Sequence, residues 1–480
     1  EKSMSRINIS IFSLLLTALI SLELNSEEEL PVLGDASSSA ISIASEYNLG
    51  RLYIAQIRRS LPEYWDPITQ DYTEHLIYRL AEYSELMDRR LEIALIDEKS
   101  INAFAAPGGI IGINTGMFLK TQTEGQFASV MCHELAHLSQ RHYARSQQNS
   151  SPLTNALILL GSVATAVVTA NPQAILIAPA LIQQLATNYT RENEREADRI
   201  GFRNLVNAGF DPKSQSQMFQ ILQKTQGNIN EEYSYLFTHP IPKERITDAR
   251  IRETKTDDQR IYRNSLEFYL VKARAEVSNS KNLNSLKSFF LTNVKNENKN
   301  IYLSKKYGLS LVLKEQKNYQ ESFKIAEDLL KENPSNLIFQ TNIIEIYLAE
   351  GNSLEAISLG EKLLEIHSNN FSISYFLAKA YVLDGSPEKA EEILINLSKE
   401  NPKDPSVWYQ LAEAQGLAGN IIGLHRSRAE YVILTRRYDS AIYQLREGLK
   451  LSKNFFEVRE SIISKLEQIY KTKRALKDLT

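Results

Sequence analysis

The chain has 480 residues, of which 43% are hydrophobic and 24% are charged, a composition typical of soluble proteins with two or more domains. Its formal net charge of -3 excludes the basic excess of a dedicated nucleic-acid-binding protein, so we expect no nucleic-acid partner. The single cysteine, Cys132, excludes an intramolecular disulfide. Because a helical neighbour of His133 points about 100° away from it, we predict that Cys132 packs in the core and is not a ligand.

The N-terminal segment has the layout of a secretory signal peptide. Residues 4–26, "MSRINISIFSLLLTALISLELNS", contain an early arginine, a short apolar run, and then small and polar residues. The apolar run is short for a membrane span. We therefore predict that residues 1–26 are a signal peptide and that the chain is exported. An uncleaved anchor and a core helix are the alternatives.

The next part predicts helices around a small sheet. Apolar residues recur at helical spacing between residues 44 and 90, and two stretches of strand character follow, "LEIALID" (91–97) and "INAFAAPGGIIGINTGMF" (101–118). The second stretch contains Pro-Gly-Gly at 107–109, which predicts a turn between two short strands. We expect these strands to form a small antiparallel sheet.

Residues 156–186, "ALILLGSVATAVVTANPQAILIAPALIQQLA", are the most apolar part of the chain after the signal peptide. An Asn-Pro pair divides them into pieces of about 14 residues, too short to cross a bilayer at about 1.5 Å per residue. We predict a helical hairpin over residues 153–187 that covers the site described below as a lid. A membrane span is the alternative.

The C-terminal part contains a repeat. Gly351, Gly385 and Gly419 are 34 residues apart, and Ala356 and Ala390 keep the same spacing. A period of 34 residues, with glycine after one helix and alanine in the next, is typical of the tetratricopeptide repeat. Each unit is a helix pair that buries its apolar face by stacking on its neighbours, so we predict an α-solenoid.

The register of this repeat changes near its end. Alanine is expected at position 424, but Leu424 stands there, and Ala441 follows 17 residues late. We therefore predict one additional helix near residues 421–437. The repeats occupy residues 261–480, and residues 27–260 form a separate N-terminal domain.

The sequence "VMCHELAHLSQRHY" at residues 130–143 indicates a metal site. His133 and His137 are four residues apart, so both lie on one face of a helix and reach one ion. Glu134 projects about 100° round the helix, beside the ion, where it can take a proton from water. This is the arrangement of the His-Glu-x-x-His zinc peptidases. A solvated amphipathic helix is the alternative, because so short a pattern also arises by chance.

A catalytic zinc site needs a third protein ligand and an open position for water. The elongated metzincin pattern requires glycine at position 140 and histidine at position 143. This chain has Gln140 and Tyr143 instead, so we exclude that class and predict that His142 is a surface residue. The third ligand must come from elsewhere, and "TRENEREADRIG" (190–201) is the acidic segment that offers candidates.

Glu194 and Asp198 in this segment are four residues apart on one helical face. One of them can bind the ion while the other orients a ligand histidine. Glu192 and Glu196 are competing ligands, and a solvated acidic helix face is the alternative. The residues alone thus predict a carboxylate ligand without deciding which side chain supplies it.

These motifs resemble the gluzincin metallopeptidases, whose third ligand is the glutamate four residues before the aspartate. "ELPVLGDASSS", "NAFAAPGGIIGINTGMF", "HELAH", "EREADRIG", "AGFDP" and "THPIPKERI", followed by the repeats, resemble the exported bacterial beta-barrel assembly-enhancing proteases over nearly the whole chain. The resemblance implies one zinc ion per chain, held by His133, His137 and Glu194. It assigns Asp198 as the supporting or proton-donating carboxylate. It also implies a mainly α fold, in which a gluzincin domain with a small sheet precedes the repeats.

The same resemblance implies a location and partners. The protein is expected in the periplasm, where it helps the assembly of outer-membrane proteins and degrades stalled barrels. Its partners are then unfolded or misassembled proteins and the barrel assembly machinery, bound through the repeats, and peripheral association with the outer membrane is compatible with this role. The relatives carry a disulfide that this chain cannot form.

His239, in "THPIPKER", is the remaining histidine of interest. It precedes Pro240, which predicts an extended or turn conformation. It can donate a hydrogen bond to the transition-state oxyanion, or it can occupy the open position of the zinc and hold the enzyme off. A surface-loop histidine is the third possibility. Arg245 would anchor the same loop by pairing with an acid.

We therefore expect a zinc-dependent endopeptidase that acts on unfolded or misassembled proteins. Glu134 accepts the proton of the attacking water and passes it to the leaving amine. The strand at residues 110–114 offers an edge to which an extended substrate adds by backbone hydrogen bonds. The alternatives are a repeat-based chaperone or scaffold with a closed zinc site, and a cytosolic repeat adaptor with a vestigial site.

Overall fold

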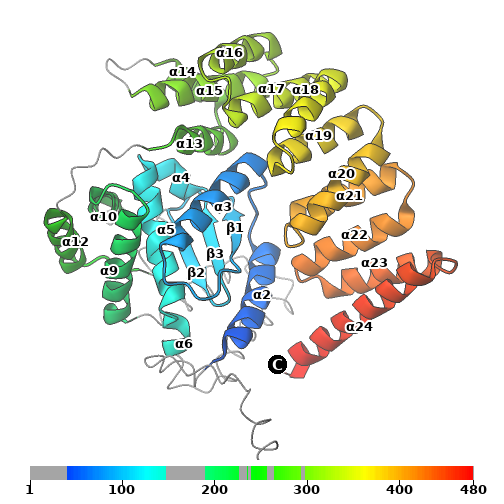
Figure 1. Cartoon of the computed structure of the whole chain (residues 1–480), viewed down its shortest axis with the longest axis horizontal. Helices are drawn as coiled ribbons and strands as arrows, with labels where there is room; N and C mark the ends of the chain where they lie inside the picture. Colours follow the sequence, from blue (N-terminus) through cyan, green and yellow to red (C-terminus); the bar gives the residue numbers. More distant parts are fainter. Residues whose placement is uncertain are drawn as a thin grey trace, which may run out of the picture. The chain divides into compact units, whose positions relative to one another are not determined.

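The computed structural model describes residues 41–146, 190–225, 235, 239–256, 264–292 and 298–478. The predicted signal peptide, residues 1–26, and the predicted hairpin, residues 153–187, lie outside these residues. Within them the protein is mainly helical with one three-stranded sheet, which confirms the predicted fold class (Figure 1). No helix in the described segments is both long enough and apolar enough to cross a membrane.

The sheet consists of β1 (Glu92–Ile96), β2 (Ala103–Ala106) and β3 (Ile110–Asn114), with β3 in the middle. β2 and β3 form the predicted antiparallel hairpin, and the turn between them contains Gly108 and Gly109 at φ angles of 74° and 77°. β1 pairs in parallel with the other side of β3, so the sheet is mixed and not purely antiparallel. The chain leaves β1, returns in the opposite direction as β2, and only then inserts β3 between them.

Helices cover both faces of this sheet, and every strand residue is buried. α2 (Ile43–Ser60) packs against one face. α3 (Pro67–Glu82) and α5 (Glu124–Ser139) join the core on the other face. Burial on both faces explains why the strands are apolar runs without alternating polar residues, apart from Glu92 at the start of β1 and Asn114 at the end of β3.

α5 is enclosed on almost every side. Its first turn is capped by Thr123, whose side chain accepts a hydrogen bond from the backbone N–H of Gln126. Each of its residues from Glu124 to His137 is buried. Cys132 is among them with 0% exposure, as predicted for core packing.

α9 (Arg191–Asn207) packs along α5. Gly201 of α9 makes this contact close, because a Cβ there would lie 3.0 Å from the backbone oxygen of Cys132 and 3.0 Å from the backbone nitrogen of His133. The other helices of this part are α4 (Gly116–Lys120), α6 (His142–Ser146), α10 (Lys213–Thr225) and α12 (Lys243–Lys255).

The C-terminal part is a series of helices in which, from α14 onward, each packs against the next, and α13 packs against α15 (Figure 1). Its helices are α13 (Leu266–Ser278), α14 (Leu283–Leu291), α15 (Lys299–Glu315), α16 (Tyr319–Glu332), α17 (Leu337–Glu350), α18 (Ser353–Ile366), α19 (Phe371–Leu383), α20 (Pro387–Glu400), α21 (Pro405–Leu417), α22 (Ile421–Leu434), α23 (Tyr438–Leu451) and α24 (Phe456–Asp478).

Turns with a left-handed residue mark the repeat. Five of these residues form a regular series, with φ angles from 55° to 91°: Lys317, Gly351, Gly385, Gly419 and Arg436. Asn369, at a φ angle of 63°, is also left-handed and lies outside the series. The spacing within the series is 34, 34, 34 and then 17 residues, which reproduces both the predicted period and its half-period shift. α22 occupies the position of the predicted additional helix, so the repeat prediction is confirmed.

The repeat helices share a core with the N-terminal part. The described residues fall in one compact unit, and a single apolar cluster includes residues of α3, α5, α13 and α17. Arg274 of α13 lies 2.8 Å from Asp66, which caps α3, and 2.8 Å from Glu345 of α17. The domain boundary predicted between residues 260 and 261 stays a prediction.

Candidate metal centre

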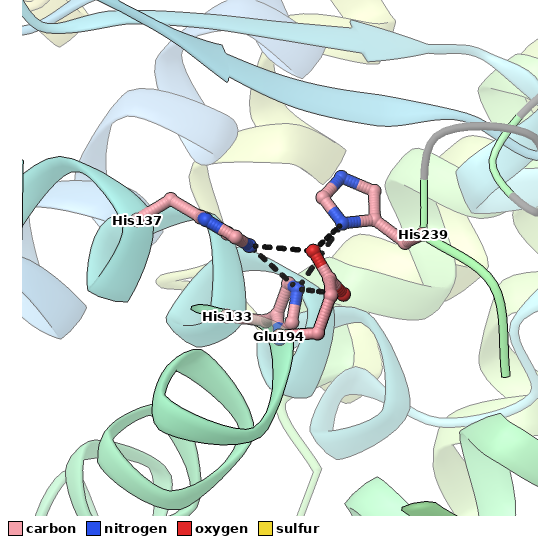
Figure 2. A group of neighbouring side chains, drawn as sticks. All are labelled: His133, His137, Glu194 and His239. Carbon is pink, nitrogen blue, oxygen red and sulfur yellow. Dashed lines mark hydrogen bonds and ion pairs between the residues drawn. The ribbon is translucent and has the colours of Figure 1, made fainter. Parts of the chain in front are cut away.

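Four buried side chains converge between α5, α9 and the segment before α12 (Figure 2). They are His133 and His137 of α5, Glu194 of α9, and His239. One donor atom of each lies within 4.8 Å of the other three, and none of the four residues is more than 4% exposed. The structure thus brings the three predicted ligands together with the histidine whose role the sequence left open.

The distances within this cluster are short. Nε2 of His137 lies 3.0 Å from Nε2 of His133. The Glu194 carboxylate lies 3.3 Å from Nε2 of His137 and 3.5 Å from Nε2 of His133. Nδ1 of His239 lies 2.9 Å from Glu194 and 3.4 Å from Nε2 of His133. Three imidazoles and one carboxylate therefore surround a single small space.

The local sequence explains why these side chains meet. Their spacing of four residues places His133 and His137 on one face of α5. α9 begins after Thr190, whose side chain accepts a hydrogen bond from the first turn, so Glu194 lies near the positive end of the helix dipole. Gly201 then allows α9 to approach the backbone of α5 beside His133.

Asp198 and Arg245 support the cluster from behind. Asp198 Oδ1 lies 3.1 Å from Nδ1 of His133. Arg245 donates to the two Asp198 oxygens at 2.7 and 2.8 Å, and its Nη1 lies 2.7 Å from Glu194. Nη1 also donates to the backbone oxygen of Pro240 at 2.7 Å. The predicted pairing of Arg245 with an acid is therefore present, and it fixes the loop before α12.

Charge at the cluster is set by these contacts. Burial alone would raise the pKa of Glu194, but His239 and the other site histidines hold it well below its usual value. Burial opposes ionisation of Asp198 as well, and Arg245 and His133 lower its pKa. Burial lowers the pKa of His137 well below its ordinary value. Burial acts to lower the pKa of His133, but Asp198 and Glu194 outweigh it and raise that pKa to about 10. Without an ion the centre therefore combines ionised carboxylates with a neutral His137 and a charged His133, and an ion that binds both rings must displace the proton of His133.

Glu134 lies beside the four donors. Its Oε2 accepts a hydrogen bond from the backbone N–H of Ala105 at 2.9 Å, and its Oε1 lies 3.5 Å from Nε2 of His239. The side chain is fully buried, and this burial raises the pKa of Glu134 against the opposing effect of His239 and His133. A carboxylate with raised proton affinity at this place suits a general base.

Ala105 belongs to β2, the outer strand of the sheet that contacts α5. β3 is hydrogen-bonded on both sides, so the prediction that residues 110–114 offer a free edge is wrong. The reason is the parallel pairing of β1, which closes the side of β3 opposite the hairpin. The N–H of Ala105 points away from β3 and toward Glu134, so the outer edge of β2 faces the site.

The prediction about His142 is wrong, and the two alternative ligands lie away from the four donors. His142, expected on the surface, is 0% exposed, and its Nδ1 lies 2.8 Å from Nδ1 of His137. Arg141, with a φ angle of 48°, turns the chain after α5 and brings His142 back to the site. Glu196, the competing ligand, contacts His142 and not the four donors, and Glu192 is exposed. A histidine five residues after the second ligand is the sequence signal for the missed contact.

The donor set fits a metal ion of the catalytic type. Two histidine nitrogens and one carboxylate are a recurrent set of protein ligands for catalytic zinc. Once the histidines are neutral, Arg245 faces the carboxylates of Glu194 and Asp198, and Glu134 adds a third acidic group to the same pocket. A cation within the cluster would compensate this excess of negative charge.

The fold and this centre define a metal-dependent peptidase that carries protein-interaction repeats. The model of Peptidase family M48 matches residues 67–253, and a model of the tetratricopeptide repeat matches residues 347–414. The chain belongs to the family of beta-barrel assembly-enhancing proteases. It is 33% identical over 341 residues to the beta-barrel assembly-enhancing protease of Escherichia coli (strain K12), a match that covers 70% of this chain and 69% of the relative.

Two further relatives extend the comparison. The putative beta-barrel assembly-enhancing protease of Vibrio cholerae is 32% identical over 67% of each chain. The mitochondrial metalloendopeptidase OMA1 of Schizosaccharomyces pombe is 29% identical over 39% of this chain and 53% of its own. These similarities confirm the predictions of a metallopeptidase and of its family, and the family match of the repeats indicates that they bind other proteins.

Proposed function

We propose that the protein is an exported zinc-dependent endopeptidase of the periplasm. It assists the assembly of outer-membrane barrel proteins and degrades those that are misassembled. The observation that carries this proposal is the convergence of His133, His137 and Glu194 with Glu134 beside them. The names of the relatives supply the connection with barrel assembly. The signal-like composition of residues 1–26 supports export.

In this proposal His133 and His137 hold one zinc ion through Nε2, and the Glu194 carboxylate is the third ligand. Zinc bound there supplies Lewis-acid chemistry, which activates water and polarises the scissile carbonyl. Asp198 Oδ1 lies 3.1 Å from Nδ1 of His133, close enough to orient that ring. Glu134 takes the proton of the attacking water on a carboxylate oxygen and delivers it to the leaving amine nitrogen.

The substrate is an unfolded or misassembled polypeptide. An extended segment adds to the outer edge of β2, where backbone hydrogen bonds bind it with little dependence on side chains. Residues 27–260 form the peptidase domain of the mature chain. Residues 261–480 bind clients or the barrel assembly machinery, and association with the outer membrane is peripheral.

Casein hydrolysis by matched variants, with bound metal measured in each, tests the peptidase assignment. Glu134→Gln is expected to keep zinc and to lower the rate by about 10²–10⁴-fold. Glu194→Gln is expected to lose zinc and activity together. Glu192→Gln, a change of the same type at an exposed position of the same helix, is the control and leaves both unchanged. Full proteolysis by Glu134→Gln would refute the assigned base.

His239 favours a second, complementary role for the protein. Its Nδ1 lies among the ligand atoms, which supports a resting state in which this imidazole fills the fourth position of the ion. Proteolysis is then latent, and the repeats act as a chaperone or scaffold while the centre is closed. His239→Ala is expected to increase casein hydrolysis at unchanged zinc content. A loss of hydrolysis would instead identify His239 as a catalytic donor to the oxyanion.

The chaperone role and the location have separate tests. If the repeats carry a chaperone function, Glu134→Gln still promotes assembly of a barrel client in cells that lack the native protein. If this variant fails to promote assembly, the proposed chaperone role is refuted, whereas the peptidase assignment is unaffected. Mass spectrometry of the mature N-terminus in a periplasmic fraction tests export. A chain that is found in the cytosol and still carries residues 4–26 would contradict it.

A further inference from the structure

His142 lies between a candidate metal ligand and the protein surface. Its side chain is buried, with Nδ1 at 2.8 Å from Nδ1 of His137 and Nε2 at 3.1 Å from Oε2 of Glu196. The same Glu196 oxygen accepts from Nη1 of Arg145 at 2.8 Å. The side chains of Glu196 and Arg145 are partly exposed, at 27% and 42%. The contacts therefore run from the cluster to the surface.

The contact between the two histidines has one consistent arrangement of protons. A hydrogen bond between two imidazole nitrogens needs one N–H donor and one lone pair. His137 directs Nε2 toward His133 and Glu194, so binding an ion there requires the lone pair of Nε2. A neutral His137 then carries its proton on Nδ1 and donates it to Nδ1 of His142. His142 in turn carries its proton on Nε2 and donates to Glu196.

His133, the other proposed ligand histidine, has a shorter series of similar contacts. Nδ1 of His133 faces Asp198 directly, and Arg245 binds both oxygens of that carboxylate. The contacts that lead outward from His137 pass through the imidazole of His142, then the carboxylate of Glu196, then Arg145. In each case a carboxylate held by an arginine fixes the proton on the outward nitrogen, and the inward nitrogen is left free to bind an ion.

We propose that His142 is a positioning residue for the metal ligand His137. It sets the tautomer and the ring orientation of His137 through the contact between the two Nδ1 atoms, and Glu196 with Arg145 sets the tautomer of His142. This inference rests on the proposed metal site, because the direction of the hydrogen bonds follows from a His137 that ligates through Nε2. The role is indirect, since His142 touches neither the ion nor the substrate.

A pair of variants with nearly the same shape isolates the contact. Asparagine at position 142 places a carbonyl oxygen near the position of the histidine Nδ1, and leucine of similar size has no acceptor there. His142→Leu is expected to weaken zinc affinity by about 10–100-fold, the usual effect of removing a partner of a ligand histidine. His142→Asn is expected to recover most of this loss. Glu196→Ala, one step further from the ion, is expected to have a smaller effect than His142→Leu.

Competition for zinc between the full chain and a chromophoric chelator measures these affinities. His75→Leu, at an exposed histidine of α3, is the control for the type of substitution and keeps the affinity of the parent chain. Equal affinities for His142→Leu and the parent chain, within about threefold, would overturn the inference while the metal site stands. A parent chain without measurable zinc affinity would instead overturn the proposed function, and this inference with it.

A measurement on the unmodified chain covers the case in which His142→Leu does not fold. The protein contains seven histidines, so a sample with ¹⁵N-labelled histidine gives a small set of ring signals. In the zinc-bound form we expect the proton of His137 on Nδ1 and that of His142 on Nε2. A proton on Nδ1 of His142 would contradict the proposal, because that nitrogen could not then accept from His137. If His142 served only to fill space in the core, its contact with His137 would not determine which nitrogen of either ring carries the proton.

Discussion

Two buried arginines in this protein have similar contacts and different surroundings. Each bridges two carboxylates: Asp66 and Glu345 for Arg274 at the junction with the repeats, and Asp198 and Glu194 for Arg245 at the metal centre. Both sets join helices that are distant in the sequence. The difference between them lies in what else the carboxylates face.

At the junction the charges balance. Lys314 lies 3.2 Å from Glu345, so two cations meet the carboxylates of Asp66 and Glu345. Lys314 also lies 3.7 Å from Glu315, whose side chain is half exposed and therefore screened by solvent. At the metal centre the two carboxylates also face histidines, which must be neutral to bind an ion, and Glu134 adds further acidic character. At the junction the protein's own cations compensate the carboxylates, whereas at the centre compensation requires protonated histidine or a bound ion.

Removing either arginine has the largest expected effect on stability. Arg274→Met and Arg245→Met each leave two buried or largely buried carboxylates without their main partner, and each should lower the free energy of unfolding by about 3–5 kcal/mol in chelator-treated protein. Zinc is expected to stabilise Arg245→Met more than the parent chain, because a divalent cation replaces the missing charge. It should stabilise Arg274→Met no more than the parent chain. Urea unfolding with and without zinc measures both effects.

Arg250→Met is the control for these two variants, because Arg250 is exposed on α12. Its effect on the free energy of unfolding should stay within about 0.5 kcal/mol. The same response to zinc in both buried variants would contradict the division into scaffold and site.

The pH dependence of stability is a second test of the ion network at the junction. Burial acts to raise the pKa of Glu345, but Arg274 and Lys314 outweigh it and lower the pKa to about 2. The folded-state pKa is thus below the unfolded value of about 4.3, so Glu345 stabilises the fold above that pH and loses this contribution as the pH falls toward 2. The expected loss from this group is about 3 kcal/mol. Unfolding measured in steps from about pH 5 to pH 2 shows it as a slope.

Glu345→Gln removes the titrating group and should flatten this slope, although it also lowers stability at neutral pH. An identical slope in the variant and the parent chain would show that other carboxyl groups cause the acid effect. The junction is suitable for this test because its partners are not metal ligands.

The comparison also shows which features a sequence can predict. The repeat follows from periodic local signals, so its period and its shift were predictable from glycine and alanine positions. The spacing of His133 and His137 is equally local. The approach of Arg245 to Asp198 depends on how α12 packs against α9, which no spacing encodes. The position of His142 was missed because it depends on the left-handed turn at Arg141, a conformation that is uncommon for arginine, so the histidine five residues after His137 was not by itself sufficient to predict the contact.

Two helical glycines distinguish the regions by steric effects. A Cβ at Gly201 would lie 3.0 Å from backbone atoms of α5, whereas a Cβ at Gly416 in α21 meets only the end of the flexible Leu424 side chain, at 2.8 Å. Gly201→Ala is expected to lower the free energy of unfolding by about 1–3 kcal/mol and to weaken zinc binding, because α9 must move away from His133. Gly416→Ala should cost less and leave zinc affinity unchanged. Urea unfolding and zinc competition measure both variants. An equal loss of zinc affinity in the two would contradict the expected difference.

The smallest expected effects come from the left-handed turns of the repeat. Position 351 holds glycine and position 317 holds an exposed lysine, at φ angles of 91° and 61°. Nothing lies within 4 Å of a Cβ at Gly351, so backbone preference decides the outcome there.

An exchange of these residue types should therefore act in opposite directions. Gly351→Lys is expected to lower the free energy of unfolding by about 1 kcal/mol, because left-handed backbone is unfavourable for a residue with a Cβ. Lys317→Gly is expected to raise it by less than about 1 kcal/mol, because the relief of that strain is partly offset by the larger conformational entropy of glycine in the unfolded chain. Urea unfolding measures both, and zinc affinity should not change in either variant. Because neighbouring repeats stabilise one another only by direct contact, a change of zinc affinity in Gly351→Lys would show that the repeats and the metal centre are coupled beyond their shared core.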